Sequence, residues 1–262
     1  MLNSLTRLRR MCVVACAPQS YRLVTRLDDG TVVTGLNRRG HGGRGIFIDR
    51  ETIEPEFRLL SSFLGKGDVL IDVGANTGIY TLRGGRLVGP QGVVLSLEPN
   101  PEMIRELAYN VEVNRLANVR IRGLAAGSRT GEAKFWANYG LPNSYGLVRH
   151  DSQSQGFSVL QISLDDLVSW EGLDRCDYIK IDAEGSEQDI LAGARQLVAR
   201  HRPVVQMEVS VATPNVEFDD YSAFVAVDQA GRRSQNTVWI PCESSRIDVA
   251  RRLGLLEATV NV

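Results

Sequence analysis

The first group of residues that could do chemistry comes from two neighbouring segments of the sequence. Residues 72–78 read Asp-Val-Gly-Ala-Asn-Thr-Gly, and Glu98 follows at the end of the next apolar run. Glycines after a buried strand form a tight turn in which a ligand can approach the backbone and the start of the following helix. A carboxylate at the end of the neighbouring strand can accept hydrogen bonds from two ribose hydroxyls. The pattern therefore predicts a site for a nucleoside-bearing ligand.

Two classes of nucleoside cofactor use this arrangement, and the glycine spacing discriminates between them. Nicotinamide cofactors require the pattern Gly-x-Gly-x-x-Gly, whose close glycines admit a pyrophosphate. Here three residues separate Gly74 from Gly78, and Asp72 stands two positions before the first glycine. An acid there opposes a pyrophosphate but complements the sulfonium and ammonium groups of S-adenosyl-L-methionine. The residues that we predict to bind this cofactor are Asp72, Gly74, Ala75, Asn76, Gly78, Glu98 and Asn100.

A second group of acids follows the apolar run at residues 178–182. Asp182 and Glu184 are two positions apart, so in an extended chain their side chains project to the same side. We predict that these two residues are catalytic. Either a carboxylate takes the proton of an acceptor group, or the acids hold a divalent ion that acidifies the acceptor. The sequence leaves both open, and we assign no metal ligand. Glu187 is better explained as a favourable charge at a helix start.

One lysine and one loop complete the set of candidate residues. Lys180 interrupts an apolar strand, where a buried charge needs a partner, and Glu208 on the next predicted strand is the partner that we expect in a structural ion pair. The loop around residues 139–145 contains Tyr139, and it contains Asn143, Ser144 and Tyr145, which we predict to bind the acceptor substrate. Such residues suit a sugar but are also common in ordinary loops.

Alternating strands and helices must position these groups. Residues 68–73 form an apolar run typical of a buried parallel strand, and further strands are predicted at residues 92–98, 119–124, 178–182 and 203–208. Helical patterns lie between them, including residues 164–170 and 186–200. Additional strands are expected at residues 132–137 and 158–162, and closing strands at residues 223–227 and 237–240. The fold class predicted is α/β and Rossmann-like, with a mostly parallel seven-stranded sheet and helices on both faces.

The N-terminal region differs in character from the rest. We divide the chain into residues 1–50, a leader with a β-hairpin extension, and residues 51–262, the Rossmann-like domain. Asp28-Asp29-Gly30 between two β-prone runs predicts the hairpin, and residues 40–45 are rich in glycine and predict a loop. The apolar run at residues 11–17 follows three arginines, but it is short for a secretory signal or a membrane span. We therefore expect a cytoplasmic protein with reduced cysteines and no membrane partner.

Charge and composition narrow the partners further. A formal net charge of −1 gives no electrostatic reason to expect a nucleic-acid partner. The carboxylates at residues 182 and 184 instead favour an oxygen acceptor, because a neutral hydroxyl must lose its proton during attack. We expect a small-molecule or sugar hydroxyl as acceptor, while the oligomeric state is not readable. The alternatives are a non-catalytic nucleoside-binding module and, less favoured, a nicotinamide-dependent oxidoreductase.

Several of these motifs together resemble one known family. Residues 67–81, which contain the glycine turn, residues 98–101 (Glu-Pro-Asn-Pro), residues 163–167 and residues 177–187 resemble the signature of the FkbM-type methyltransferase family, in the family's order. The resemblance covers about residues 50 to 210. It implies a class I methyltransferase fold, S-adenosyl-L-methionine as methyl donor, and O-methylation of a sugar or secondary-metabolite hydroxyl.

Overall fold

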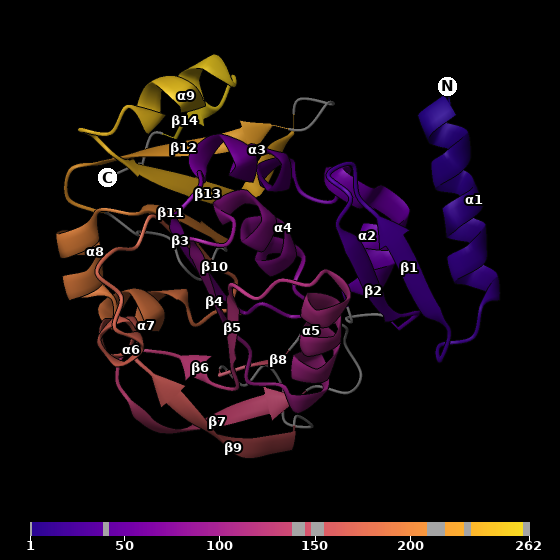
Figure 1. The fold of residues 1–262 in the computed structure, drawn as a ribbon, viewed down its shortest axis with the longest axis horizontal. Helices are drawn as coiled ribbons and strands as arrows, with labels where there is room; N and C mark the ends of the chain where they lie inside the picture. The colour runs from indigo at the N-terminus through magenta and orange to yellow at the C-terminus, as the bar shows by residue number, and fades with distance from the viewer. Residues whose placement is uncertain are drawn as a thin grey trace.

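The core of the protein is a mixed eight-stranded sheet, with strand order β14-β12-β13-β11-β10-β3-β4-β5 (Figure 1). The computed structural model describes residues 2–38, 42–137, 145–147, 155–208, 218–227 and 232–258, with the backbone alone for residues 2–4, 137, 145 and 155. Five adjacent strands are parallel: β5 (Val119–Arg122), β4 (Val93–Leu97), β3 (Val69–Val73), β10 (Tyr178–Ile181) and β11 (Val204–Glu208). Three antiparallel strands follow β11: β13 (Arg233–Pro241), β12 (Tyr221–Val227) and β14 (Leu256–Glu257).

The antiparallel end is where the sheet departs from the predicted seven mostly parallel strands. The described chain places eight strands in this sheet, and the last three are antiparallel. Strand β14 pairs with β12 through only two residues, a length at which no alternating pattern is recognisable. Strand β13 begins at Arg233 rather than at residue 237, because its first residues are polar and carry no apolar signal.

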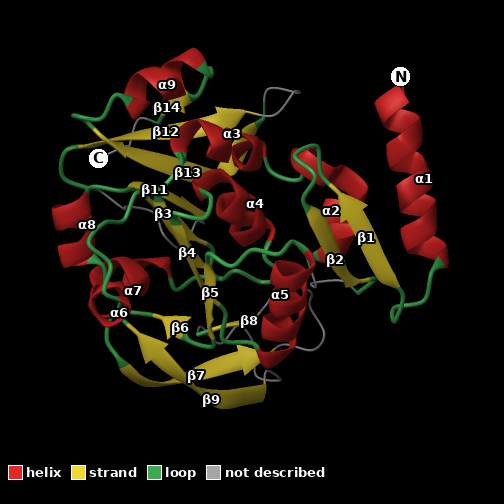
Figure 2. Ribbon diagram, in the orientation of Figure 1, coloured by secondary structure: helices red, strands yellow, loops and turns green. Residues whose placement is uncertain are grey.

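Helices cover both faces of the sheet (Figure 2). Successive strand residues alternate between two apolar clusters, so Leu70 and Tyr178 belong to one and Ile71 and Ile179 to the other. Buried side chains of α3 (Pro55–Phe63), α4 (Ile79–Val88) and α9 (Arg246–Arg252) complete the first cluster. Those of α6 (Leu164–Glu171), α7 (Glu187–Ala192) and α8 (Arg195–His201) complete the second. The central strands β3, β4, β10 and β11 are therefore buried on both sides, as their predominantly apolar sequences require.

A second, four-stranded sheet lies near the end of the parallel strands, with strand order β6-β9-β7-β8 (Figure 1). It comprises β6 (Ala125–Ala126), β7 (Gly131–Ala137), β8 (Tyr145–Gly146) and β9 (Gln155–Ile162). We predicted one helix over residues 186–200, but the structure has two, α7 and α8. They are separated at Gly193, which packs against the start of the second sheet. A Cβ atom at Gly193 would come within 2.2 Å of the Gly127 carbonyl oxygen, so this close approach requires glycine.

The N-terminal region is more ordered than the predicted leader. Helix α1 (Leu2–Cys16) precedes β1 (Arg22–Arg26) and β2 (Val32–Leu36), which pair antiparallel, and α2 (Gly43–Asp49) and a 3₁₀ turn (Arg50–Thr52) follow. Helix α2 begins inside the stretch that we predicted as a loop over residues 40–45. The Asn37 side chain fastens α1 by donating hydrogen bonds to the carbonyls of Val14 and Ala17, at 3.0 and 2.8 Å. No helix in the described ranges is long and apolar enough to cross a membrane.

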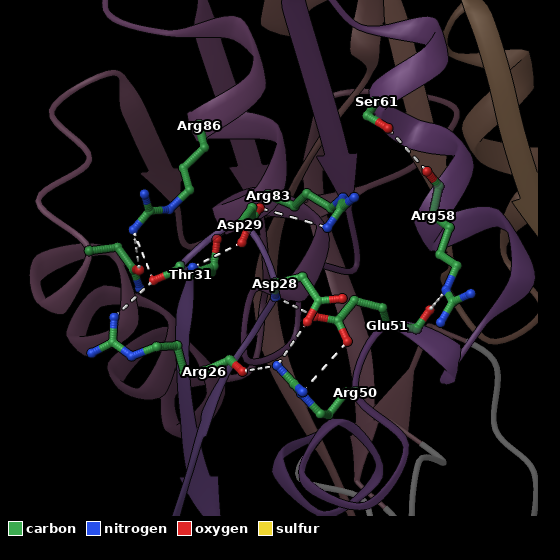
Figure 3. A network of polar contacts seen from close by, with 12 residues as sticks. Arg26, Asp28, Asp29, Thr31, Arg50, Glu51, Arg58, Ser61, Arg83 and Arg86 are labelled. Carbon is green, nitrogen blue, oxygen red and sulfur yellow. Dashed lines mark hydrogen bonds and ion pairs between the residues drawn. The ribbon is translucent and has the colours of Figure 1, made fainter. Parts of the chain in front are cut away.

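Polar contacts attach the turn between β1 and β2 to the main domain (Figure 3). Arg83 of α4 lies 3.7 Å from the Asp29 carboxylate, and Arg86 donates to the Gly30 carbonyl at 3.3 Å. Arg50 reaches the Asp28 carboxylate at 3.2 Å, and Glu51 accepts a hydrogen bond from the Asp28 amide at 2.6 Å. The hairpin is thus held against α4, whose N-terminus begins at the predicted glycine turn.

Helix α5 (Pro101–Val113) lies between strand β5 and the hairpin strand β2 (Figure 1). Asn100 caps its first turn by accepting a hydrogen bond from the Glu102 amide at 2.9 Å, and Pro101 occupies the position where its missing donor costs nothing. The helix therefore starts directly behind Glu98, at the end of β4.

Candidate active site

A pocket opens where the parallel strands β3, β4 and β10 end. This edge is where ligands bind in open α/β sheets. The main sheet contributes Val73, Gly74, Leu97 and Asp182, and the second sheet contributes Ala125, Ala126, Phe135 and Gly146 to the opposite side. The second sheet therefore forms one wall of the pocket, which the sequence did not reveal.

The glycine turn after β3 has the geometry that its sequence predicts. Gly74 has φ +73°, and a Cβ atom there would come within 1.8 Å of the Asp182 carbonyl oxygen. Gly78 has φ +92° at the start of α4, where a Cβ atom would meet the Leu107 side chain at 2.3 Å. Gly74 and Asn76 line the pocket, whereas Ala75 and Gly78 shape the turn behind it. Both glycines are thus required by backbone conformation and by space.

Glu98 occupies the end of β4 on the wall of the pocket, only 6% exposed. Its two carboxylate oxygens accept hydrogen bonds from the backbone amides of Asn76, at 2.9 Å, and Asn100, at 2.8 Å. Burial raises the pKa of Glu98 to about 7, although the two amide donors partly offset this effect. Glu98 therefore joins the glycine turn to the start of α5, and each oxygen keeps lone-pair capacity for a ligand.

Asp72 lies behind the pocket rather than on its wall. We predicted that Asp72 contacts the cofactor, but its side chain is fully buried and accepts a hydrogen bond from the Thr81 hydroxyl at 2.6 Å. In the parallel register Asp72 lies between Ser96 of β4 and Lys180 of β10. Burial raises the pKa of Asp72, and the Lys180 charge counteracts the rise. Asp72 thus belongs to a buried polar row that crosses the sheet beneath α4.

The two predicted catalytic acids reach the pocket together. Asp182 and Glu184 both line it, just beyond the end of β10. Glu187 is buried at the start of α7, where its carboxylate accepts hydrogen bonds from the amides of Ala183 and Gly185, at 3.3 and 3.1 Å. Glu187 therefore supports the loop that carries the two acids and does not line the pocket.

The ion pair of Lys180 differs from the one that we predicted. Its ammonium lies 3.1 Å from Asp182 Oδ2, two residues along its own strand, and Glu208 is not its ion-pair partner. The register explains the difference, because Lys180 lies beside Gln206 on β11 rather than beside Glu208. The Tyr80 ring lies over the ammonium, with 5.0 Å between the nitrogen and the ring centroid. Lys180 is thus enclosed beneath the acids of the pocket.

Most of the residues predicted to bind the acceptor substrate lie outside the described part of the chain. Tyr139, Asn143 and Ser144 lie outside the described residues, and only the backbone of Tyr145 is described, in β8. The apolar lining that sequence reasoning missed comes from α5, the second sheet and its borders: Met103, Leu124, Ala125, Ala126, Phe135 and Leu147. Strands were predicted around Leu124 and Phe135 and a helix around Met103, but nothing in the sequence located these residues at the pocket. Within the described ranges, no three His, Cys, Asp or Glu side chains converge as metal ligands.

Comparison with known proteins identifies the family. Residues 72–233, more than half of the chain, match the family described as "Methyltransferase FkbM domain". The chain belongs to the FkbM methyltransferase family. All the pocket-lining residues named above lie within this match, whereas the N-terminal hairpin lies outside it. The resemblance noted in the sequence is therefore confirmed.

Individual relatives of this FkbM methyltransferase are distant. A protein named 2-O-methyltransferase NoeI, from Sinorhizobium fredii, is 29% identical over 194 residues, which are 67% of this chain and 77% of that protein. Methyltransferase 1 of Beauveria bassiana is 25% identical over 143 residues, 47% of this chain and 57% of that protein. A crystal structure of methyltransferase FkbM from Methylobacillus flagellatus is 18% identical, with a TM-score of 0.45 over 75% of this chain and 52% of that chain. The match spans little more than half of the last two proteins.

Proposed function

We propose that this protein transfers a methyl group from S-adenosyl-L-methionine to a hydroxyl of a sugar or another small molecule. The observation that carries the proposal is the buried Glu98 carboxylate at the end of β4, beside a glycine turn at the end of β3. A carboxylate there can accept hydrogen bonds from ribose hydroxyls, while Gly74, which packs against the Asp182 carbonyl, also lines the pocket. The described residues therefore fit this cofactor.

The acceptor end of the proposed site is formed by Asp182 and Glu184. S-adenosyl-L-methionine supplies, when bound, an electrophilic methyl group on a sulfonium with a good leaving group. The chain must then orient the acceptor and remove its proton. Carboxylates suit a hydroxyl acceptor, and the name of the Sinorhizobium relative, 2-O-methyltransferase, agrees with oxygen as the target. The open, acid-bearing pocket favours an enzyme over a non-catalytic module.

Cofactor binding provides the first test. In calorimetry we expect S-adenosyl-L-methionine and S-adenosyl-L-homocysteine to bind and NAD not to bind. The Glu98→Ala variant should lose about 1.5–3 kcal/mol of binding free energy, because it removes hydrogen bonds to a charged acceptor. Glu132→Ala, on the exposed surface of β7, is the matched control and should bind as the wild type does. A preference for NAD, or unchanged binding by Glu98→Ala, would exclude this cofactor assignment.

Product analysis provides the second test. The protein is incubated with methyl-labelled S-adenosyl-L-methionine and, in separate reactions, a panel of glycosides, a small-molecule extract and bulk RNA. We expect label in a stable methyl ether, located on a hydroxyl oxygen by mass spectrometry with fragmentation. A methylamine, a methyl ester or methylated RNA as the product would contradict oxygen as the acceptor atom.

A further inference from the structure

The two acids at the end of β10 have different surroundings. Asp182 Oδ2 lies 3.1 Å from the Lys180 ammonium, while the Asp182 side chain remains 36% exposed toward the pocket. Glu184, also on the pocket wall, forms neither a hydrogen bond nor an ion pair through its carboxylate with any described residue. One oxygen of the Asp182 carboxylate is thus occupied by the ammonium, whereas neither oxygen of Glu184 is held by a described residue. The two residues are therefore not equivalent candidates for the base.

Lys180 is fixed in its contact with Asp182. It is only 5% exposed, its neighbours across the sheet are Asp72 and Gln206, and the Tyr80 ring covers its ammonium. Burial by itself would lower the pKa of Lys180, but the carboxylates of Asp182, Asp72 and Glu54 outweigh it, so the pKa lies above its ordinary value. The lysine is accordingly a permanent cation under Asp182.

Glu184 is surrounded by like charge. Asp182 on its own segment, Glu208 at the end of β11 and Glu187 on α7 all face it, and Lys180 is the opposing cation. Burial first, and then these three carboxylates, raise the pKa of Glu184 to about 7, with the lysine partly offsetting the rise. Its backbone has φ +50°, an uncommon value for a residue with a side chain, which turns the chain at the pocket wall. A carboxylate with such a pKa is matched to proton transfer near neutral pH.

We propose that Glu184 is the catalytic base, and that Lys180 is a positioning residue that occupies Asp182 and so leaves proton transfer to Glu184. The inference rests on the proposed function. In the step, the proton of the acceptor hydroxyl goes to a carboxylate oxygen of Glu184, and a lone pair of the hydroxyl oxygen forms the new bond to the methyl carbon. The carbon–sulfur bond breaks with its electron pair on sulfur, so the sulfonium becomes a neutral thioether. Protonated Glu184 then releases its proton to solvent.

The protonation of Glu184 can be measured without an acceptor. In protein labelled with ¹³C at the glutamate carboxyl carbon, NMR titration should reveal a resonance that titrates near pH 7 and is absent from Glu184→Gln. Asp182→Asn should shift this titration to lower pH because it removes a repelling charge, and Lys180→Met should shift it to higher pH because it removes an attracting one. Lys180→Arg should titrate as the wild type does. Lys134→Met, on the exposed surface of β7, is the control.

Turnover separates the two acids directly. With the acceptor found in the product assay, Glu184→Gln should lose about 100-fold or more in kcat while its affinity for S-adenosyl-L-homocysteine stays within a few-fold. Asp182→Asn should lose clearly less turnover than Glu184→Gln, and the acid limb of its pH–rate profile should move to lower pH. Lys180→Met should move that limb to higher pH, and Lys180→Arg should restore it, which a purely structural lysine would not do.

The outcomes distinguish this inference from the proposed function. Loss of turnover in Asp182→Asn with activity retained in Glu184→Gln would overturn the assignment of the base, while methyl transfer itself stood. A Glu184 resonance that titrates at the ordinary pH of a glutamate would overturn it as well, and so would unchanged titration in all the Lys180 variants. If S-adenosyl-L-methionine does not bind the wild type, the proposed function fails, and the assignment of the base fails with it.

Discussion

Glu98 combines two roles that its position in the chain makes possible. Its carboxylate accepts the Asn76 amide from the glycine turn and the Asn100 amide from the start of α5, so it fixes two pocket segments relative to each other. The same carboxylate is the one that we propose to bind the ribose. Because both amides donate from fixed backbone positions, its orientation is set before a ligand arrives.

Cofactor binding should therefore depend on pH through Glu98. Ribose hydroxyls donate to the ionised carboxylate and so favour it, while the free carboxyl has a pKa of about 7. Binding should release a proton below pH 7, and affinity should rise with pH by up to about tenfold per unit before levelling off near pH 8. Calorimetry in buffers of different ionisation enthalpy measures both quantities.

Two variants identify the group responsible for this pH dependence. The slope should disappear in Glu98→Gln and persist in Glu132→Gln, whose carboxylate is exposed. It should also persist in Glu184→Gln, the other pocket acid with a raised pKa. If the pH dependence survives in Glu98→Gln but disappears in Glu184→Gln, the released proton comes from Glu184, which contradicts its assignment to Glu98.

The sequence predicted the pocket residues better than it predicted their partners. Residues that follow three parallel strands share one sheet edge whatever their neighbours, which is why Gly74, Glu98 and Asp182 could be brought together in advance. Asp72 lies behind the pocket because it projects from the same face of β3 as Leu70, and its neighbours are apolar on both faces, so the strand shows no alternation that would reveal this. The partner of Lys180 was missed because the strand register determines it.

At the level of elements, α5 holds the N-terminal hairpin through two asparagines four residues apart, and one of them also reaches the glycine turn. Asn110, fully buried, accepts from the Thr34 amide at 2.9 Å and donates to the carbonyls of Thr34, at 2.9 Å, and of Thr77, at 2.8 Å. Asn114 binds the amide and the carbonyl of Val32 but does not contact the turn. Only Asn110 therefore joins β2 to the pocket.

This difference gives a matched pair of variants. Asn110→Ala and Asn114→Ala should each lower the free energy of unfolding by about 1–3 kcal/mol, because each leaves backbone groups of β2 without partners. Those at Thr34 are buried and those at Val32 are partly buried, so the larger loss is expected for Asn110→Ala. Only Asn110→Ala should also weaken binding of S-adenosyl-L-homocysteine, by about tenfold, because the Thr77 carbonyl that it holds belongs to the turn. Denaturant titration and calorimetry test the two effects. Equal affinities in the two variants would mean that the hairpin supports the fold alone.

Helices and strands with a clear pattern of apolar residues were predicted from the sequence, and those without one were not. All five parallel strands were expected close to their observed positions. Four of them, β3, β4, β10 and β11, are predominantly apolar, whereas β5 (Val-Arg-Ile-Arg) alternates apolar and charged residues. The break between α7 and α8 was not expected, since it follows from the contact of Gly193 with Gly127 far away in the sequence. Helix α1 was not expected either, because arginines and exposed apolar side chains alternate along it without a clear core-facing stripe.

At the scale of the whole molecule, the pocket lies between parts that are distant in sequence. The parallel sheet supplies one wall and the second sheet another, while the hairpin supports the glycine turn from outside. Figures 1 and 2 show how these two sheets and the hairpin are arranged. The described chain also buries or half-buries several carboxylates, including Glu98 and Glu184 on the pocket wall. Burial is the first cause that raises the pKa of five of them: Glu56, Asp72, Glu98, Glu184 and Glu208.

These buried acids should make the folded protein most stable in mildly acidic solution. Each binds a proton more tightly in the folded chain than in the unfolded chain, so its contribution is full below the unfolded pKa of about 4.3 and is lost as pH rises through the folded value. For Glu98, with a folded pKa of about 7, this contribution is on the order of 3 kcal/mol. Acids with lowered pKa values change the stability in the opposite direction, but only at lower pH. Glu243 is an example, because its hydrogen bond with Arg202 lowers its pKa to about 2.

The free energy of unfolding should therefore fall as pH rises from about 5 to 8, and this is measurable by denaturant titration at several pH values. Glu98→Gln replaces the acid with a permanently neutral side chain, so its stability should depend less steeply on pH over this range. The exposed Glu132→Gln should follow the wild type throughout. A free energy of unfolding that is constant or increases between pH 5 and 8 would contradict the raised pKa values. Glu98 is the most enclosed of the acids on the pocket wall, so we expect its replacement to change the pH dependence of stability. If that dependence is the same in Glu98→Gln as in the wild type, the other buried acids cause it.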